Sequence, residues 1–390
     1  MSLPIQSVTA RNFLSFGPLT ETVELRGLNI LVGPNGAGKS NLLETLVLMH
    51  EVPDNLAAYL RAGGGSAQFV WKGGAESEAA TVELEGTSLE GKPFHHSISF
   101  ATAGQTYEIT REVIRTSTPS GRLSSVPTYS FEDSVPVFRP TPKRKMTFNR
   151  GDINIAQSVV SDQQDYDFDR VFRPISRIYG AFRFYRARHF NQIDVARAAV
   201  PTDLPNRFLE PNGQNLASVI NRLLANKEAK RTIDDYMTRF YEGYEGIATQ
   251  VQGGTIQIYL IEKKFRRPTP ATRLSDGTMR WLAILAILAD PDPAPLICIE
   301  EPETGLHPDA VVELAKLLRD ASVRTQLIVT THSDTLIDCF TEEPEAVIVC
   351  ERAEGATKLS RLVESDLRVW LKLYSLGKLW RRNQIGGNRW

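Results

Sequence analysis

The 390-residue chain is long enough for one large domain or two ordinary ones, and its 42% hydrophobic content is normal for a protein with a buried core. Its 45 basic and 46 acidic side chains leave a net charge of -1, which excludes a uniform field for nucleic acid or anionic membrane. The 3 cysteines stand at unrelated spacings, which indicates a reducing compartment. The N-terminus lacks a signal-peptide pattern, and the longest apolar run, 281–289, is too short to cross a bilayer. We therefore expect a cytoplasmic protein that does not enter a membrane.

The first part of the chain predicts strands around a glycine-rich loop. The elements are strands at 5–10, 22–25 and 28–32 and, after the loop, a helix over 40–50. Alternating apolar and polar residues from 81 to 115 predict an antiparallel sheet. Residues 116–168 lose this periodicity and are rich in Ser, Thr, Pro and Arg. This composition predicts a long surface loop, which carries the basic stretch 139–145.

The second part predicts a small helical lobe and then alternating helices and strands. Apolar residues at helical spacing over 216–224 and 233–240 indicate two amphipathic helices. The elements that follow are helices at 277–289, 308–320 and 333–340, which alternate with strands at 295–300, 325–331 and 346–351. Such alternation is typical of a parallel sheet covered by helices. No repeat or sustained heptad pattern occurs, so we expect no long coiled coil.

The glycine-rich loop has the spacing of a phosphate-binding loop. Its small residues allow successive backbone N–H groups to curl around a phosphate at a helix N-terminus, and it stands between a strand and a helix. An ordinary glycine turn would need neither this spacing of small residues nor a position between a strand and a helix. Lys39 would contact the β- and γ-phosphates of ATP, and Ser40 would bind the Mg²⁺ that bridges them. The predicted nucleotide-binding residues are Gly33, Pro34, Asn35, Gly36, Ala37, Gly38, Lys39, Ser40 and Asn41.

Two adjacent carboxylates follow the apolar run 296–299. They would lie at the C-terminal end of a central strand, where open α/β sheets bind their ligands. Glu300 would hold Mg²⁺ or its waters, and Glu301 would act as general base or orient the attacking water. The alternative is that both carboxylates are merely solvated surface charges. This alternative is weaker here, because two adjacent unpaired charges at the end of a buried strand are unfavourable unless a cation is bound.

Two further motifs have both a structural and a functional interpretation. Ser275 and Gly277 precede the apolar helix at 277–289, where Ser275 is an ordinary N-cap or, together with the free N–H groups, part of an anion site. His332 follows the strand at 325–331, where a histidine is either a hydrogen-bonded loop residue or a catalytic group.

Together these motifs, GPNGAGKS, LSDGT, LICIEEPETGLHP and VTTHSD, stand in the order P-loop, signature, Walker B and switch histidine. This order resembles the ABC-ATPase heads of the SMC, RecF and OLD families and related ATPases of bacterial DNA-repair and phage-defence systems. The resemblance implies an α/β P-loop NTPase of ABC-head type, with a mixed central sheet, an antiparallel β subdomain and a small helical lobe. It also implies a homodimer in which Ser275 and Gly277 of one subunit meet the γ-phosphate on Lys39 of the other. Glu301 and His332 would then drive hydrolysis, so that ATP acts as a switch.

The chain is expected to divide into four parts. These are an N-terminal lobe (1–115), an insertion with the basic loop and helical lobe (116–250), a C-terminal lobe (251–365) and a C-terminal tail (366–390).

Some features depart from the family pattern. Asp276 stands where the common signature has glycine, and its charge would repel a γ-phosphate unless it points outward. Gln192 is the candidate for the Q-loop glutamine. The chain has no long coiled coil and no room for a nuclease domain after His332, so nuclease chemistry would require a separately encoded effector.

The first functional hypothesis is an ATPase that acts on or around DNA in repair or anti-phage defence. Its basic candidates are the arginines at 170, 173, 177, 183, 186 and 188, the stretch 139–145, and Lys378, Arg381, Arg382 and Arg389 near Trp380 and Trp390. Each is equally compatible with a solvated surface. The alternatives are a regulatory scaffold that binds a protein partner and no DNA, and a transporter ATPase subunit. The latter would need a glycine-rich LSGGQ-type signature, which the sequence lacks.

Overall fold

The computed structural model describes residues 3–74, 78–104, 106–132, 135–141, 144–149, 154–161, 166–187 and 193–386. The chain forms two units, each considered by itself. Unit 1 consists of Met1–Phe182, Ile348–Leu362 and Ile385–Trp390, and unit 2 consists of Arg183–Val347 and Val363–Gln384.

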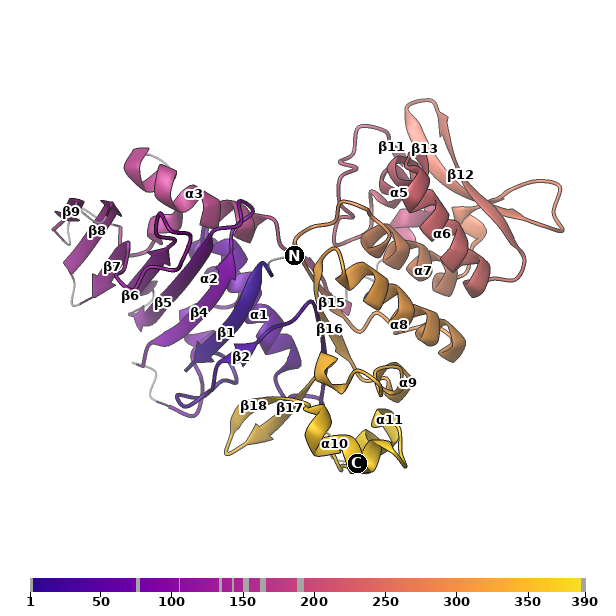
Figure 1. Ribbon diagram of the computed structural model, residues 1–390. Coiled ribbons are helices and arrows are strands. Elements are labelled where there is room, and N and C mark those ends of the chain that lie inside the picture. Colours follow the sequence, from indigo (N-terminus) through magenta and orange to yellow (C-terminus); the bar gives the residue numbers. More distant parts are fainter. Residues whose placement is uncertain are drawn as a thin grey trace. The chain divides into compact units, whose positions relative to one another are not determined.

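Unit 1 contains an antiparallel sheet in the order β2-β1-β4-β5-β6-β7-β8-β9 (Figure 1). Its strands are β1 (Ile5–Arg11), β2 (Val23–Glu24), β4 (Ala80–Thr87), β5 (Pro93–Ala103), β6 (Thr106–Thr116), β7 (Tyr129–Glu132), β8 (Val135–Thr141) and β9 (Arg144–Thr147). The predicted antiparallel sheet is thus confirmed. It is longer than the sequence indicates.

The prediction of a loop over 116–168 is wrong, because β7, β8 and β9 extend the sheet there. Tyr129 pairs with Phe138 across β7 and β8, and both side chains are buried. The Phe138 ring packs on Phe172, with 5.7 Å between centroids. The alternation of these aromatic residues is only two or three residues long in each strand and lies among Pro, Ser and Arg, so it gives little periodic signal.

Helix α3 (Tyr166–Gly180) begins within the predicted loop and buries Phe172, Ile175, Ile178 and Tyr179. The carbonyl of Tyr179 lies 2.6 Å from Nδ1 of His50 in α1 (Lys39–Glu51). Helix α3 therefore packs against the helix that follows the glycine-rich loop. The arginines at 170, 173 and 177 lie on its exposed side.

A buried polar network lies in the core of unit 1. Glu112 is 1% exposed and accepts hydrogen bonds from the Ser158 hydroxyl and, at 3.1 Å, from the backbone N–H of Val159. Its carboxylate also lies 3.0 Å from Nε2 of His96, whose Nδ1 lies 3.2 Å from the Tyr179 hydroxyl. These partners satisfy the carboxylate, as a buried charge requires. The network ties β5, β6 and α3 together.

Unit 1 also contains a second group of helices and strands, and two of these flank the glycine-rich loop. The group consists of β3 (Leu28–Val32), α1, the short helix α2 (Leu56–Ala62) and the hairpin of β17 (Val347–Ala353) and β18 (Ala356–Arg361), in which β17 neighbours β3. All five residues of β3 are buried.

Unit 2 contains the parallel strands β10 (Arg183–Tyr185), β15 (Leu296–Glu300) and β16 (Gln326–Thr331). Its helices are α5 (Leu216–Ala225), α6 (Lys227–Phe240), α7 (Asp276–Leu288), α8 (Pro308–Ser322), α9 (Asp334–Asp338), α10 (Glu364–Leu371) and α11 (Leu376–Arg381). The predicted alternation and the two amphipathic helices of the lobe are confirmed. Helix α7 is buried almost all round, and its Trp281 stacks on Phe240 of α6 with centroids 5.2 Å apart.

A second small sheet in unit 2 joins β11 (Val200–Pro201), β13 (Thr255–Glu262) and β12 (Tyr244–Gln252), with β14 (Thr269–Pro270) paired to β13. The β12–β13 hairpin is labelled in Figure 1. Its strands follow the helical lobe and lead into α7.

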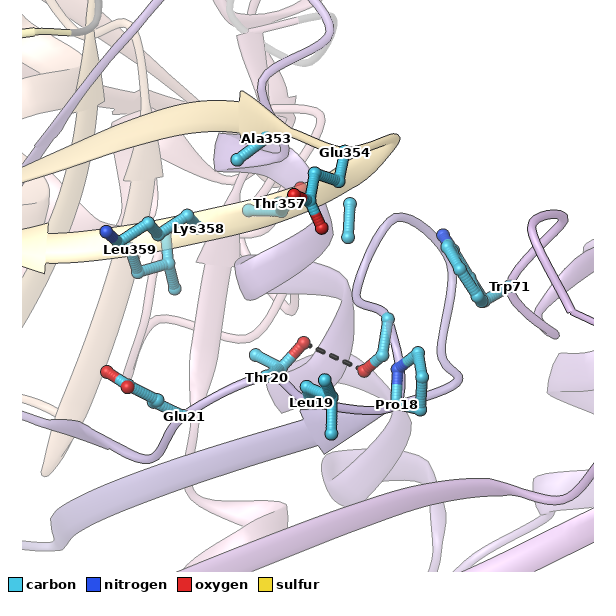
Figure 2. Close-up of a pocket in the computed structure, with 12 residues that line it drawn as sticks. Pro18, Leu19, Thr20, Glu21, Trp71, Ala353, Glu354, Thr357, Lys358 and Leu359 are labelled. Atoms are coloured by element: carbon cyan, nitrogen blue, oxygen red, sulfur yellow. Dashed lines mark hydrogen bonds between the residues drawn. The ribbon is translucent and has the colours of Figure 1, made fainter.

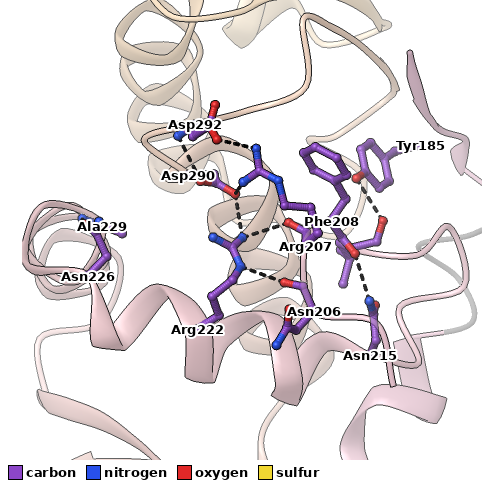
Figure 3. A network of polar contacts seen from close by, with 11 residues as sticks. Tyr185, Asn206, Arg207, Phe208, Asn215, Arg222, Asn226, Ala229, Asp290 and Asp292 are labelled. Carbon is purple, nitrogen blue, oxygen red and sulfur yellow. Dashed lines mark hydrogen bonds and ion pairs between the residues drawn. The ribbon is translucent and has the colours of Figure 1, made fainter. Parts of the chain in front are cut away.

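Asp290 links the turn between α7 and β15 to the helical lobe through polar contacts. It is 2% exposed and accepts a hydrogen bond of 2.6 Å from Arg222 of α5. Arg222 also donates to the carbonyls of Asn206 and Arg207, at 2.7 and 2.9 Å. The Arg207 guanidinium lies 3.8 Å from Asp290 and 4.7 Å from the centroid of the Phe208 ring. Figure 3 shows these side chains converging on the turn.

Among the residues that the structure describes, no helix has both the length and the apolar character needed to cross a membrane.

Candidate functional site

The loop between β3 and α1 has the backbone conformation that phosphate binding requires. Gly33, Gly36 and Gly38 all have positive φ values, of 155°, 76° and 104°. A Cβ atom on Gly33 would lie 2.2 Å from the carbonyl oxygen of Cys350, and one on Gly38 would lie 2.2 Å from the Thr357 hydroxyl. Only glycine fits these two positions without a shift of neighbouring atoms.

Lys39 begins α1 and is buried, at 6% exposure. Its ammonium donates to the carbonyls of Gly33 and Pro34, at 2.7 and 3.2 Å. The charge is therefore held inside the curl of the loop, where a phosphate would compete with these carbonyls. Ser40 follows it and is exposed, so its hydroxyl is accessible to a ligand.

Two residues outside the motif brace the loop. The Thr357 hydroxyl donates to the carbonyl of Ala37 at 2.9 Å and lies within hydrogen-bond distance, 2.6 Å, of Oγ of Ser15. Asn41 donates to the same Ser15 oxygen, also at 2.6 Å. Asn41 thus fixes the start of α1 to the segment after β1.

Two hollows lie in unit 1, and the larger of them adjoins the loop. One, of about 530 Å³, is lined by residues that include Ser15, Gly36, Asn41, Trp71 and Arg352. A second, of about 300 Å³, shares the Trp71 and Glu354 side chains with it. Figure 2 shows the second hollow between the β17–β18 hairpin, the segment around Thr20 and Trp71. The first hollow has the size of a small-molecule site and lies next to the loop residues, so it is the candidate for the nucleoside.

The two predicted carboxylates lie at the end of β15 in unit 2. Glu300 is the last residue of the strand and is partly exposed. Glu301 has a φ of 45°, which is uncommon for a residue other than glycine, and its N–H donates to the carbonyl of Thr330 at 2.9 Å. Its side chain is 37% exposed and lies 3.6 Å from Nε2 of His332. The structure thus brings Glu301 and His332 together at neighbouring strand ends.

Glu303 supports this pair and was not predicted from the sequence. Its Oε1 accepts hydrogen bonds from the Thr331 hydroxyl and, at 3.1 Å, from the N–H of His332, and its Oε2 is buried. Burial is the largest effect on this carboxyl and raises the pKa of Glu303 above its ordinary value of 4.5. Glu303 therefore positions the backbone of His332.

Ser275 is the N-cap of α7 and accepts a hydrogen bond of 3.1 Å from the N–H of Thr278. The structural interpretation of this serine is confirmed, while the functional one stays a prediction. Asp276 points outward and pairs with Arg197 of the short helix η4 (Ile193–Arg197). Arg197 also donates to the carbonyl of Leu274. Its positive charge offsets the carboxylate that departs from the common signature.

Gly277 has no positive φ, and a Cβ atom there would meet the carbonyl oxygen of Gly305 at 3.5 Å, an ordinary contact. The fold of unit 2 alone thus gives no reason for glycine at this position. Arg280 of the same helix donates to the carbonyl of Thr304 at 2.6 Å and links α7 to the loop after Glu301.

The other sequence candidates are dispersed. Gln192, Arg188, Arg389 and Trp390 lie outside the described residues, as do positions 142 and 143 of the basic stretch. Arg183 lies over the ring of Phe208, Arg381 pairs with Asp334 at 3.2 Å, and Arg382 lies over Tyr374. These three arginines therefore have intramolecular partners.

The family model that matches residues 28–338 is described as "AAA domain, putative AbiEii toxin, Type IV TA system". The match covers most of the chain and includes the glycine-rich loop, the carboxylates and His332. The chain belongs to this AAA-domain family. As a member it is an ATPase.

Other proteins are similar to this AAA-domain chain. It is similar to a Helicobacter pylori protein named ATP/GTP phosphatase, with 23% identity over 387 residues and 95% of each chain covered. It also resembles the SMC head bound to the C-terminal winged-helix domain of ScpA, with a TM-score of 0.55, 15% identity and coverage of 93% of this chain and 99% of that one. A second SMC head, bound to the ScpA C-terminal domain derived from Pyrococcus furiosus, gives a TM-score of 0.50 at 13% identity, with 95% and 99% covered. These structures show the fold, which is the predicted ABC-head type.

In this AAA-domain chain, sequence reasoning missed Ser15, Arg197, Glu303 and Thr357. A signal existed only for Glu303, the third acid of the run EEPE. The other three lie far along the chain from the residues that they support, so only the fold reveals them.

Proposed function

We propose that the chain binds Mg-ATP on the loop 33–40 and hydrolyses it with Glu301 as general base. The observation that carries this proposal is the loop itself, with positive φ at three glycines and Lys39 buried at the start of α1. The AAA-domain family membership and the Helicobacter pylori relative named ATP/GTP phosphatase support it.

The oxygen donors on this chain suit Mg²⁺. The Ser40 hydroxyl and the Glu300 carboxylate are hard ligands, and Mg²⁺ bound to nucleotide phosphates needs only one or two protein oxygens. We propose that these two hold the ion or its waters. Mg²⁺ would neutralise charge on the phosphates, while Glu301 takes a proton from the attacking water and His332 contacts the γ-phosphate.

We propose further that ATP joins two copies head to head. The N-terminus of α7, with the N–H groups from Gly277 onward, would receive the γ-phosphate held by Lys39 of the other copy. Two observations support this: Arg197 neutralises Asp276, and the fold of unit 2 gives no other reason for glycine at 277. Hydrolysis would remove the γ-phosphate and release the dimer.

The biological setting that we propose is a cytoplasmic switch in DNA repair or anti-phage defence that works with a separately encoded effector. The family description, with its type IV toxin–antitoxin system, supports the defence setting. A regulatory scaffold that captures a protein partner without DNA is the alternative. Salt-sensitive DNA binding by the purified chain would distinguish the two.

The dimer is tested by Ser275→Arg, which places a long cation at the α7 N-terminus. We expect unchanged ATP binding by the monomer and loss of ATP-dependent association in light scattering. Asn226→Arg is the matched control, because Asn226 caps α6 in the same way and is exposed. Normal association of the Ser275 variant would contradict the proposed interface.

A further inference from the structure

A short turn in unit 2 combines positive charge with an exposed aromatic ring. Residues 263–268, KKFRRP, connect β13 to β14, and all six are exposed. Phe265 is 61% exposed, and its N–H donates to the carbonyl of Glu262 at 3.0 Å, which closes the turn. The turn therefore presents Phe265 to solvent between two pairs of cations.

Among the described residues, the adjacent acid Glu262 forms no ion pair with these cations. Both oxygens of the Glu262 carboxylate accept hydrogen bonds of 2.6 Å, one from the Tyr241 hydroxyl and one from the Thr269 hydroxyl. Lys263 donates to a backbone carbonyl, that of Glu242, at 3.0 Å. Within the described part of the chain, no ion pair joins Lys264, Arg266 or Arg267 to a carboxylate. The positive charge of the turn is thus available to a ligand.

The positive charge of this turn contrasts with the chain as a whole, whose net charge is -1. Several arginines discussed above, among them Arg183, Arg197 and Arg381, pair with a carboxylate or lie on an aromatic ring of the same unit. A local cluster of cations that form no ion pairs attracts phosphate groups, and an exposed aromatic ring between the cations suits an unpaired base. An acidic peptide would use the charge but not the ring.

We propose that the turn 263–268 binds single-stranded nucleic acid. Lys264, Arg266 and Arg267 contact successive phosphates, and Phe265 stacks on a base. Strand β14 pairs with β13 and leads through η5 (Ala271–Arg273) to Ser275. The nucleic acid would therefore bind to the segment that positions the N-terminus of α7. This inference goes beyond the proposed ATP switch and does not depend on it, since binding is measured without nucleotide.

The test is fluorescence anisotropy of the full chain with a labelled oligothymidylate of about 16 nucleotides. Lys264→Glu, Arg266→Glu and Arg267→Glu are combined in one variant, and Phe265→Ala is a second. The matched control combines Lys227→Glu, Arg231→Glu and Lys316→Glu, which changes the charge equally at exposed positions of the same unit. Melting temperatures verify that all variants are folded.

We expect the turn variant to lose at least about tenfold in affinity and to reduce the slope of log K against log salt by about 2, since each phosphate contact to a single strand contributes about 0.7. Phe265→Ala should lower the affinity roughly five- to 150-fold, the range measured for the loss of one stacked base. The control should bind like the wild type. Equal losses in turn variant and control would overturn the assignment, and so would normal binding by the turn variant. Unchanged binding by Phe265→Ala would contradict the proposal, because the turn would then bind acidic partners in general through its charge alone. Equal affinity of the turn for a duplex and for a single strand would also contradict it.

Failure of this test leaves the ATP switch untouched, because neither the loop 33–40 nor Glu301 takes part in the measurement. Conversely, a chain that binds the oligothymidylate as expected but does not hydrolyse ATP would contradict only the proposed function.

Discussion

Among the partly exposed arginines discussed above, Arg222 should be the one whose replacement by alanine lowers the stability of unit 2 most. The change removes three hydrogen bonds of a charged group, to Asp290, Asn206 and Arg207. It also leaves the buried Asp290 carboxylate with the N–H of Asp292 at 3.0 Å and the Arg207 guanidinium at 3.8 Å. Removing one partner of a buried pair costs about 3–5 kcal/mol.

The remaining partners of Asp290, and the 26% exposure of the Arg222 side chain, place the expected loss at the lower end, about 3 kcal/mol. For a unit of 150 to 250 residues, this corresponds to a fall in melting temperature of roughly 6–12 °C. Differential scanning calorimetry measures it. Arg231→Ala on α6 is the control, because its pair with Asp235 is long, at 3.9 Å, and 85% and 56% exposed. We expect less than about 0.5 kcal/mol there.

Adding Asp290→Asn to Arg222→Ala removes the carboxylate that the loss of Arg222 leaves unpaired, so the double variant should recover part of the lost stability. The reasoning is refuted if Arg222→Ala melts like the control. It is also refuted if Asp290→Asn gives no recovery, since the cost would then lie in lost packing and not in an uncompensated carboxylate.

Two further predictions concern the site. Gly33→Ala should lower the free energy of unfolding of unit 1 by at least about 2 kcal/mol and abolish ATP binding, because the added Cβ would meet the Cys350 carbonyl. Gly36 has open space around it, so Gly36→Ala should lower the free energy of unfolding by only about 1 kcal/mol, measured without nucleotide. Chemical denaturation of both variants measures the difference, and equal losses would contradict this account of the loop. The raised pKa of Glu303 means that the native state binds this proton more tightly than the unfolded chain, so its contribution to stability is full below pH 4.5 and falls as the pH rises through the raised pKa. Glu303→Gln should remove that fall in melting scans from about pH 5 to about pH 8, and an unchanged pH dependence would refute the assignment.

The sequence predicts well what local patterns determine. The run 28–32, the loop with Lys39 and the helix after it follow from apolar residues and glycine spacing. The strand that ends at Glu300 and the strand that ends just before His332 follow from buried apolar runs. Strands β7 to β9 escape prediction because their aromatic positions are few and flanked by proline and arginine. Contacts such as Thr357 to Ala37, or Arg197 to Asp276, escape because residues 320 and 79 positions apart meet only in the folded chain.

We propose that Glu301 drives ATP turnover and that ATP holds two copies of the chain together. The most direct measurement compares Glu301→Gln with the wild type for phosphate release and, in the same samples, for molar mass by light scattering with ATP. We expect turnover to fall about 10²- to 10⁴-fold while an ATP-bound dimer accumulates, and we expect the exposed control Glu342→Gln to behave like the wild type. Hydrolysis by Glu301→Gln at the wild-type rate, or a variant that stays monomeric with ATP bound, would contradict the account.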